Sequence, residues 1–161
     1  MNDFPQMKAV VAMSLNRVIA DKNRIPWRIP QDSEWFKSLI KGYTVLVGRL
    51  TFLNMRGLKG QKFIVLSSTM EQNGNVPVIR SFADLSGTRF AEPIWVCGGT
   101  RVYKEALPFC SDLYLTLVKR KVKGDTFFPA FEGAFYLEKV IEDNEELSIR
   151  HYRRQKTTSK S

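Results

Sequence analysis

The sequence predicts an α/β fold: a three-layer sandwich around a mixed, mainly parallel central sheet, with an antiparallel edge formed by the C-terminal strands. Two observations predict it. Up to residue 107, short continuous apolar runs alternate with helical segments, which is typical of parallel strands buried on both faces. Beyond Pro108, three longer strand-like segments follow one another at 112–121, 136–142 and 147–154 without helices between them, which indicates antiparallel pairing.

The chain opens with a strand, a loop and a helix. The apolar run at 9–13 is predicted to be a central strand, because it does not alternate with polar residues. Residues 16–28 are polar and irregular, so they are predicted to form a long loop of the kind that often covers a ligand. A helix is predicted from Gln31 to about Lys41, with Asp32 in its first turn.

The middle of the chain adds further short elements. Strands are predicted at 44–47, 63–68, 76–79 and 94–97, and helices near 50–55, 81–85 and 101–107. In open α/β sheets, ligands bind at the carboxyl ends of the strands. Three segments fall there, at 26–32, 48–51 and 98–100, and we expect the functional residues in them.

Length and composition indicate one packed domain. The 161 residues are predicted to form a single domain over 1–161, with frayed ends at 1–7 and 156–161. Apolar residues make up 43% of the chain, yet no run is long enough to cross a bilayer, and the first residues do not resemble a signal peptide. We therefore expect a cytoplasmic protein without a membrane partner.

The charge points to a phosphate-bearing small molecule. The chain has 25 Lys and Arg against 16 Asp and Glu, a net charge of +9, but these residues are dispersed and no nucleic-acid recognition motif accompanies them. Cys97 and Cys110 are expected to be reduced structural thiols. His151 is the only histidine and is expected at the surface, so neither a Ser-His-Asp triad nor a metal site is predicted.

Two glycine-containing turns suggest a dinucleotide. The segments 48–51 and 98–101 each follow a strand and open a helix, where free backbone N–H groups can receive a phosphate. Either one alone is more often an ordinary tight turn, and neither is a Gly-x-Gly-x-x-Gly fingerprint or a P-loop. Together they fit the two phosphates of a dinucleotide. The basic and hydroxyl groups near strand ends favour NADPH over NADH, since a 2′-phosphate needs such partners: Arg49, Ser67, Ser68, Arg80 and Arg101.

Asp32 has two possible roles. On spacing alone, capping of its helix is the simpler one, and Trp27 and Phe36 would by default be core residues. Desolvation by the surrounding apolar residues would raise the pKa of Asp32, whereas a helix N-terminus would lower it. The residues themselves do not decide between these two effects.

Six ordered segments resemble the dihydrofolate reductase family, in register from about Lys8 to about Gln155. They are Asn16-Arg17-Val18-Ile19, residues 25–32 (Ile-Pro-Trp-Arg-Ile-Pro-Gln-Asp), Trp35-Phe36-Lys37, Gly48-Arg49-Leu50-Thr51, residues 98–103 (Gly-Gly-Thr-Arg-Val-Tyr) and residues 124–129 (Gly-Asp-Thr-Phe-Phe-Pro). The resemblance implies a monomeric enzyme that reduces 7,8-dihydrofolate to 5,6,7,8-tetrahydrofolate with NADPH, by hydride transfer to pterin C6, and that binds no nucleic acid.

The resemblance also implies roles for single residues. Asp32 would hold the pterin ring, Trp27 would pack beside the reacting rings, residues 16–28 would form a lid, and Asp125 would steady that lid. The pair Gly98-Gly99 would be joined by a cis peptide. The implied substrate contacts are Ala12, Ile25, Phe36, Leu58 and Thr116, and the implied cofactor contacts are Ala12, Ile19, Gly48, Arg49, Thr51, Ser67, Ser68, Arg80, Gly98, Gly99, Thr100, Arg101 and Val102.

Departures from the family pattern affect the substrate. The family usually carries, where this chain has Gln61, an arginine that binds the α-carboxylate of the substrate's glutamate tail. Lys59 or Lys62 would have to replace it, or the substrate would be a related dihydropterin that lacks this contact, for example dihydromethanopterin. Ala20 replaces a glycine and would change the flexibility of the lid, and Ser33 replaces an apolar residue and would change the shape of the pocket.

More distant alternatives are a pyrimidine reductase of riboflavin synthesis and a non-catalytic nucleic-acid-binding module.

Overall fold

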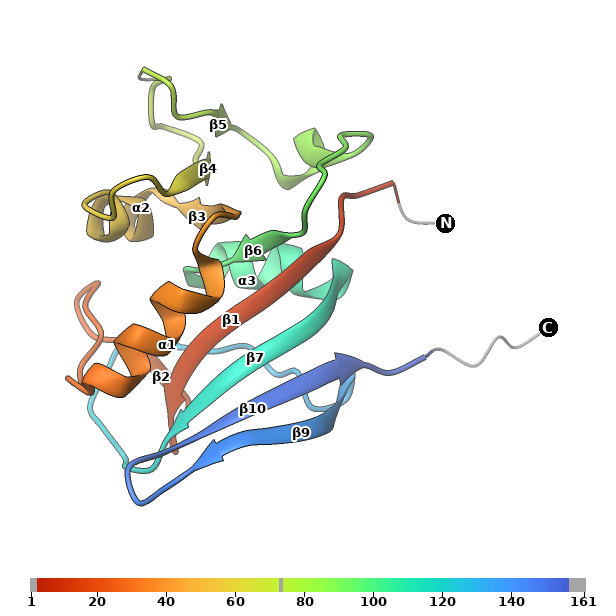
Figure 1. Ribbon diagram of the computed structural model, residues 1–161. Helices are drawn as coiled ribbons and strands as arrows, with labels where there is room; N and C mark the ends of the chain where they lie inside the picture. Colours follow the sequence, from red (N-terminus) through yellow and green to blue (C-terminus); the bar gives the residue numbers. More distant parts are fainter. Residues whose placement is uncertain (1–2, 73, 157–161) are drawn as a thin grey trace.

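The computed structural model describes residues 3–72 and 74–156. Within them, an eight-stranded sheet has the order β5-β4-β3-β6-β1-β7-β10-β9 (Figure 1). Its strands are β1 (Met7–Ser14), β3 (Thr44–Gly48), β4 (Lys62–Leu66), β5 (Val78–Ile79), β6 (Ile94–Val96), β7 (Cys110–Val118), β9 (Phe135–Asp143) and β10 (Leu147–Arg154). The strands from β5 to β7 pair in parallel, and β10 pairs antiparallel with β7 and β9. The predicted mixed sheet with an antiparallel C-terminal edge is confirmed.

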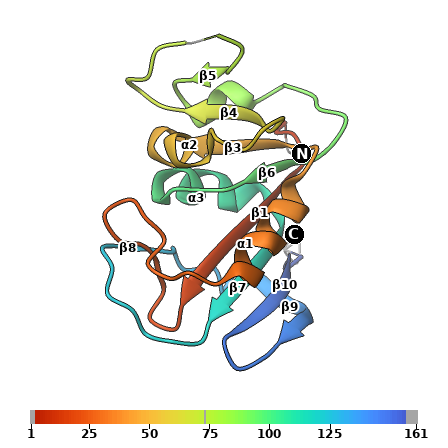
Figure 2. The ribbon, with the colours of Figure 1, turned by 60° about the vertical axis from the view of Figure 1, so that its left-hand side comes forward.

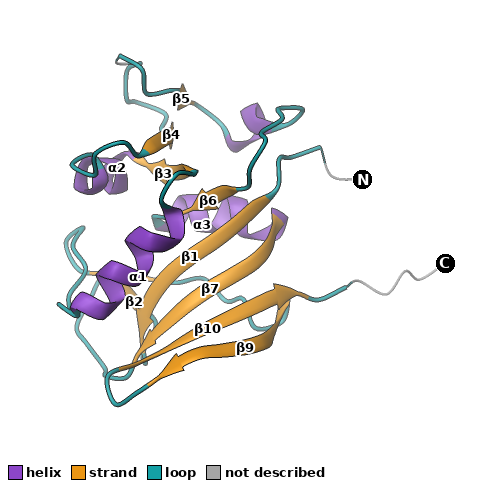
Figure 3. Ribbon diagram, in the orientation of Figure 1, coloured by secondary structure: helices purple, strands orange, loops and turns teal. Residues whose placement is uncertain are grey.

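Helices cover both faces of the sheet, with α1 in front of it and α3 behind it in Figure 3. The helices are α1 (Pro30–Ile40), α2 (Arg49–Met55) and α3 (Thr100–Ala106), with short 3-10 helices η1 (Phe82–Leu85) and η2 (Leu107–Phe109). Val45 and Val47 of β3 pack in the core that α1 and α2 cover, whereas Leu46 packs in the core that α3 and η1 cover. Because both faces of β3 are buried, its sequence is apolar throughout.

The expected lid loop contains a strand. Residues Val18–Ala20 form β2, which pairs antiparallel with β8 (Thr126–Phe127) in a separate two-stranded sheet. Figure 2 shows β8 beside the lid segment. A strand of three residues is too short to give a periodic pattern, and its partner lies more than 100 residues further along the chain. The prediction of an irregular loop over residues 16–28 was therefore wrong at this strand.

The expectation of a frayed segment over residues 1–7 is also corrected. Met7 begins β1 and is fully buried, and the ring of Phe4 lies 4.8 Å from that of Phe82 and 4.3 Å from that of Phe109. This aromatic packing holds the segment from residue 4 against the domain. Lys156 is exposed and irregular, while the other expected frayed positions, 1–2 and 157–161, lie outside the described residues.

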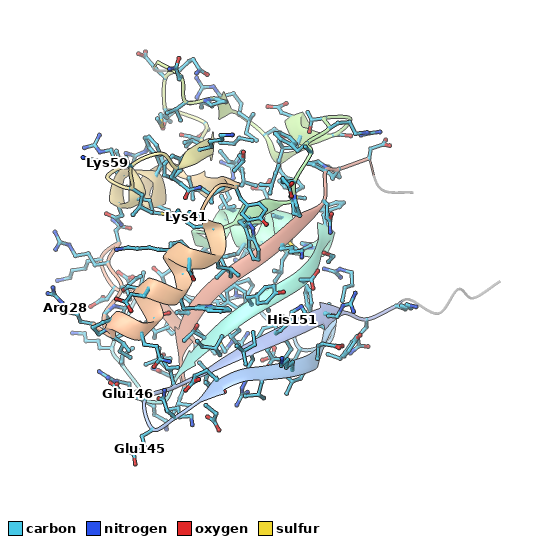
Figure 4. The ribbon with its side chains drawn as sticks, viewed as in Figure 1. Arg28, Lys41, Lys59, Glu145, Glu146 and His151 are labelled. Carbon is cyan, nitrogen blue, oxygen red and sulfur yellow. The ribbon has the colours of Figure 1, made fainter. Side chains whose placement is uncertain are left out.

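His151 is not a free surface residue as expected. It lies on β10 (Figure 4), its side chain is 17% exposed, and its Nε2 is 2.6 Å from Oδ2 of Asp112. Its ring stacks on Tyr114 at 4.3 Å. Burial raises the pKa of Asp112, but hydrogen bonds from Ser111 and His151 outweigh burial and lower it. The histidine thus belongs to a structural pair far along the sheet from the segments with predicted functional residues.

The two cysteines are free and buried, as expected of structural thiols. Burial raises the pKa of both, that of Cys110 to about 12, so neither is a reactive thiolate at neutral pH.

Candidate active site

A cavity of about 860 Å³ opens at the carboxyl ends of the central parallel strands, between α1, α2, the start of α3 and the lid segment. Most of the residues singled out from the sequence line it: Ala12, Ile19, Ile25, Asp32, Phe36, Gly48, Arg49, Thr51, Leu58, Ser67, Ser68, Gly98, Gly99, Thr100, Arg101, Val102 and Thr116. Residues that are far apart in the chain thus meet in one space, at the edge of the sheet where ligands of α/β folds bind.

Asp32 is the only carboxylate among the described residues that line the cavity. It is 7% exposed, and Nε1 of Trp27 donates a hydrogen bond to its Oδ2 at 3.1 Å. Burial raises the pKa of Asp32, while hydrogen bonds from Trp27 and Thr116 act in the opposite direction. Ile29 is the N-cap of α1 and no side chain caps this helix, so the capping role is excluded for Asp32.

Two predicted residues do not line the cavity. Trp27 is buried behind Asp32 and touches the site through its hydrogen bond to that carboxylate. The guanidinium of Arg80 donates to the carbonyl oxygens of Ser67, at 3.0 Å, and of Met70. Arg80 thus braces the segment after β4 through its Nη1 atom, and its direct contact with the cofactor stays a prediction.

The two glycines after β6 bring bare backbone to the cavity wall. A cis peptide joins Gly98 to Gly99, as the resemblance implied, and Gly98 has a φ of +118°. The carbonyl oxygen of Gly98 accepts a hydrogen bond from the N–H of Gly48 at 2.8 Å, which ties this turn to the start of α2. A Cβ atom at Gly98 would lie 3.3 Å from the ring of Tyr103, whose hydroxyl donates to the carbonyl oxygen of Val10 at 2.7 Å.

The substitution Gly98→Ala is expected to lower the free energy of unfolding by about 1–3 kcal/mol, the usual cost of a side chain in a sparsely populated backbone conformation. Gly99→Ala is the matched control, because a Cβ atom there would meet only Oγ1 of Thr51 at 3.7 Å, an ordinary contact. Urea unfolding of the two variants measures the difference. Equal stability of both variants would contradict the conformational requirement at Gly98.

Basic and hydroxyl side chains gather at the far end of the cavity from Asp32. Arg49 has no ion pair among the described residues, whereas Nε of Arg101 lies 2.7 Å from a carboxylate oxygen of Glu105. Thr51 and Ser68 add hydroxyl groups. This end can therefore bind phosphate through Arg49, hydroxyls and backbone N–H groups.

Sequence reasoning missed several polar residues on the cavity wall. They are Asn23 and Arg24 in the lid, Lys37 on α1, Asn54 on α2 and Thr69 after β4. Lys37 lies five residues after Asp32, about 140° further around the helix axis, so the spacing of the two residues gave no signal. Exposed polar residues look like an ordinary solvated surface.

Hydrogen bonds from the side chains of Asn16 and Asn54, and to the side chain of Asp125, are three of the contacts that hold the lid segment. The Asn16 side chain exchanges two hydrogen bonds with the backbone of Val122, at 2.8 and 3.1 Å. The N–H of Lys22 donates to Oδ2 of Asp125 at 3.1 Å. Nδ2 of Asn54 donates to the carbonyl oxygen of Asn23 at 2.7 Å.

Within residues 3–72 and 74–156, no helix is long and apolar enough to traverse a membrane. The same residues include no group of three or more His, Cys, Asp or Glu side chains that is placed to hold a metal ion.

The fold and the cavity define a class of protein, an α/β protein with a ligand-binding cavity at the carboxyl ends of its parallel strands. The sequence model of one family, dihydrofolate reductase, matches residues 6–157, nearly the whole chain. The chain belongs to the dihydrofolate reductase family.

Relatives are found among bacterial enzymes. The dihydrofolate reductase of Haemophilus influenzae is 37% identical over 122 residues, 74% of this chain and 76% of that enzyme. That of Buchnera aphidicola subsp. Acyrthosiphon pisum is 33% identical over 126 residues, 76% of this chain and 78% of its own. The structure of dihydrofolate reductase from Enterococcus faecalis, complexed with NADP(H) and RAB-propyl, is similar with a TM-score of 0.80 at 28% identity, over 94% of this chain and 97% of that one.

Proposed function

We propose that this protein is a monomeric, NADPH-dependent dihydrofolate reductase that converts 7,8-dihydrofolate to 5,6,7,8-tetrahydrofolate. One observation carries the proposal: among the described residues that line the cavity, Asp32 is the one carboxylate and is buried, and the same wall holds several hydroxyls and Arg49, for which the described residues provide no ion pair. Family membership and the NADP(H) complex of the Enterococcus faecalis enzyme support the same cofactor.

The cavity fits NADPH. When bound, the cofactor supplies a hydride from nicotinamide C4. Arg49, Thr51 and Ser68 would hold its phosphates and ribose, together with the N–H groups that open α2 and α3. Bare backbone at Gly98 and Gly99 lets the cofactor approach the sheet closely. The further contacts proposed are Ala12, Ile19, Gly48, Ser67, Thr100, Arg101 and Val102.

Asp32 would orient the pterin. Its two oxygens would accept hydrogen bonds from the ring amino group and the neighbouring ring N–H, which fixes the face that meets the cofactor. Thr116 would contact the same amino group, while Ile25 and Phe36 would pack on the ring. Since no other carboxylate lines the described cavity, the proton that N5 gains would come from water, with Asp32 favouring the protonated ring.

Gln61 motivates a second candidate, a reductase of a dihydropterin without the glutamate-tail contact, such as dihydromethanopterin. The Gln61 amide donates to the carbonyl oxygen of Tyr43 at 2.5 Å and does not line the cavity. Lys59, labelled in Figure 4, and Lys62 are exposed and do not line it either. Lys37 does line the cavity and offers a cation to a tail.

Oxidation of NADPH, followed with dihydrofolate, dihydromethanopterin and a tail-less dihydropterin, tests the proposal. Dihydrofolate should be turned over, and Gln61→Arg should lower its KM about tenfold by adding a charge-assisted contact while leaving the tail-less compound unaffected. Lys59→Arg, which keeps the charge of an exposed neighbour, is the control. If none of the three compounds is turned over, the proposal that the protein is a reductase is refuted. A preference for a compound without the glutamate tail would favour the second candidate.

A further inference from the structure

The tip of the lid is a tight turn between two backbone hydrogen bonds. The N–H of Asp21 donates to the carbonyl oxygen of Arg24 at 2.8 Å, and the N–H of Arg24 donates back at 3.0 Å. The two central residues, Lys22 and Asn23, have φ values of 50° and 66°, as in a type I′ hairpin turn. The tip therefore has a defined shape, and it moves as a unit when the lid moves.

This turn is gripped from two sides. On one side its N–H at Lys22 donates to Asp125. On the other side its carbonyl oxygen at Asn23 accepts from Nδ2 of Asn54 at 2.7 Å, a contact between residues 31 positions apart. Asn23 and Asn54 both line the cavity, so this second hydrogen bond joins the lid to α2 at the cavity wall.

Asn54 is carried by a firmly seated helix. Phe52 of α2 is 8% exposed and packs edge-on against Phe63 of β4, with ring centroids 5.1 Å apart. Arg49 and Thr51, the proposed cofactor contacts, belong to the same seven-residue helix. A rigid α2 therefore joins the proposed cofactor seat directly to the lid.

We propose that Asn54 is a positioning residue: its carboxamide latches the lid to α2, and the latch must open before the cofactor can leave. This rests on the proposed function, because it takes the cofactor to lie between α2 and the lid. The hydrogen bond to Asn23 requires a donor at Asn54. Aspartate, which has the same shape, cannot donate and would place negative charge against the carbonyl oxygen.

The test is the rate constant for NADPH dissociation, measured by stopped-flow fluorescence for Asn54→Ala and Asn54→Asp. Both should release the cofactor about three- to tenfold faster, the change expected for one hydrogen bond. Leu53→Ala is the matched control, since Leu53 is a neighbouring exposed residue of α2 that does not line the cavity. The midpoint of thermal unfolding of Asn54→Ala should equal that of the control, which separates a latch from a general loss of stability.

Amide hydrogen exchange of the cofactor-free protein provides a second, independent measurement. The amides of Asp21 and Arg24, protected by the turn, should exchange several times faster in both Asn54 variants than in Leu53→Ala, while those of β10 should not change. This measurement tests the latch even if the wild-type protein does not bind NADPH. Failure to bind NADPH would refute the proposed function but would leave the hydrogen bond between Asn54 and the lid to be judged from the exchange rates.

Three results would overturn the latch. The first is unchanged exchange at the turn in both variants. The second is cofactor release from the Asn54 variants within about twofold of the control, less than one hydrogen bond supplies. The third is unchanged release with a raised KM for the dihydropterin, which would make Asn54 a substrate contact.

Discussion

Replacing Asp32 by asparagine is expected to lower turnover at pH 7 by about 10²- to 10⁴-fold, the range typical of a lost acid–base group. The amide keeps the shape of the side chain, and its oxygen can still accept the hydrogen bond from Trp27. It removes the negative charge that would grip the ring N–H groups and favour protonation. Steady-state kcat and a fluorescence titration with NADPH measure the two effects separately, and the cofactor affinity should be unchanged.

The same substitution is expected to raise the free energy of unfolding at pH 7. Burial raises the pKa of Asp32 in the folded protein, so the fold favours the protonated carboxyl. The stabilisation from this group is fully present below the unfolded pKa and is lost as the pH rises through the folded pKa. Asparagine does not ionise and so avoids that loss. The difference in unfolding free energy between the variant and the wild type should therefore vanish at a pH below 3.8, the ordinary pKa of an aspartate.

Urea unfolding of the wild type and of Asp32→Asn, at pH 7 and at pH 3, measures whether the substitution raises or lowers the free energy of unfolding at each pH. Lower stability of the variant at pH 7 would contradict the effect of burial on this carboxyl. An equal loss of turnover and of NADPH binding would contradict the assignment of Asp32 to the substrate.

Gly124→Ala is expected to cut the rate of hydride transfer about tenfold or more, although Gly124 does not line the cavity. A Cβ atom there would lie 2.2 Å from Cγ1 of Val18 and 2.8 Å from the carbonyl oxygen of Ala20. One of the two strands of the β2–β8 sheet must therefore move. The neighbouring hydrogen bonds from Asp125 N–H to Ala20 and from Lys22 N–H to Asp125 would be disturbed together.

Single-turnover oxidation of NADPH measures this effect. Gly133→Ala is the control, because a Cβ atom at Gly133 meets nothing within 4 Å. A Gly124→Ala enzyme that transfers hydride as fast as the Gly133→Ala enzyme would show that the β2–β8 pairing does not hold the lid in its working position.

The parallel strands at the centre of the sheet could be predicted because they are mostly buried on both faces and therefore mostly apolar. Strand β10 was predicted with the observed bounds, Leu147–Arg154. The strands β2 and β8 could not be predicted in this way, since each has two or three residues and is defined only by its pairing with the other. The same holds for Phe4, whose partners Phe82 and Phe109 come from distant segments.

The candidate site was predicted only in part from the residues themselves. Spacing alone placed Asp32 in a first turn, where capping is the simpler role, and the family resemblance was needed to assign it to a pocket. The charge of Arg80 suggested a phosphate contact, and only the structure shows that its Nη1 also donates to two backbone carbonyl oxygens. Lys37 and Asn54 are exposed polar residues in helices, so only their three-dimensional position marks them as part of the cavity wall.

The outermost strand, β9, is exposed along almost its whole length and shows Leu137, Val140 and Ile141 to solvent. Its register against β10 shifts twice within nine residues. Such irregularities bend and twist a strand, and a twisted border is a poor template for another molecule to extend. The sheet can therefore end on a strand that exposes several apolar side chains without inviting fibre growth in concentrated solution.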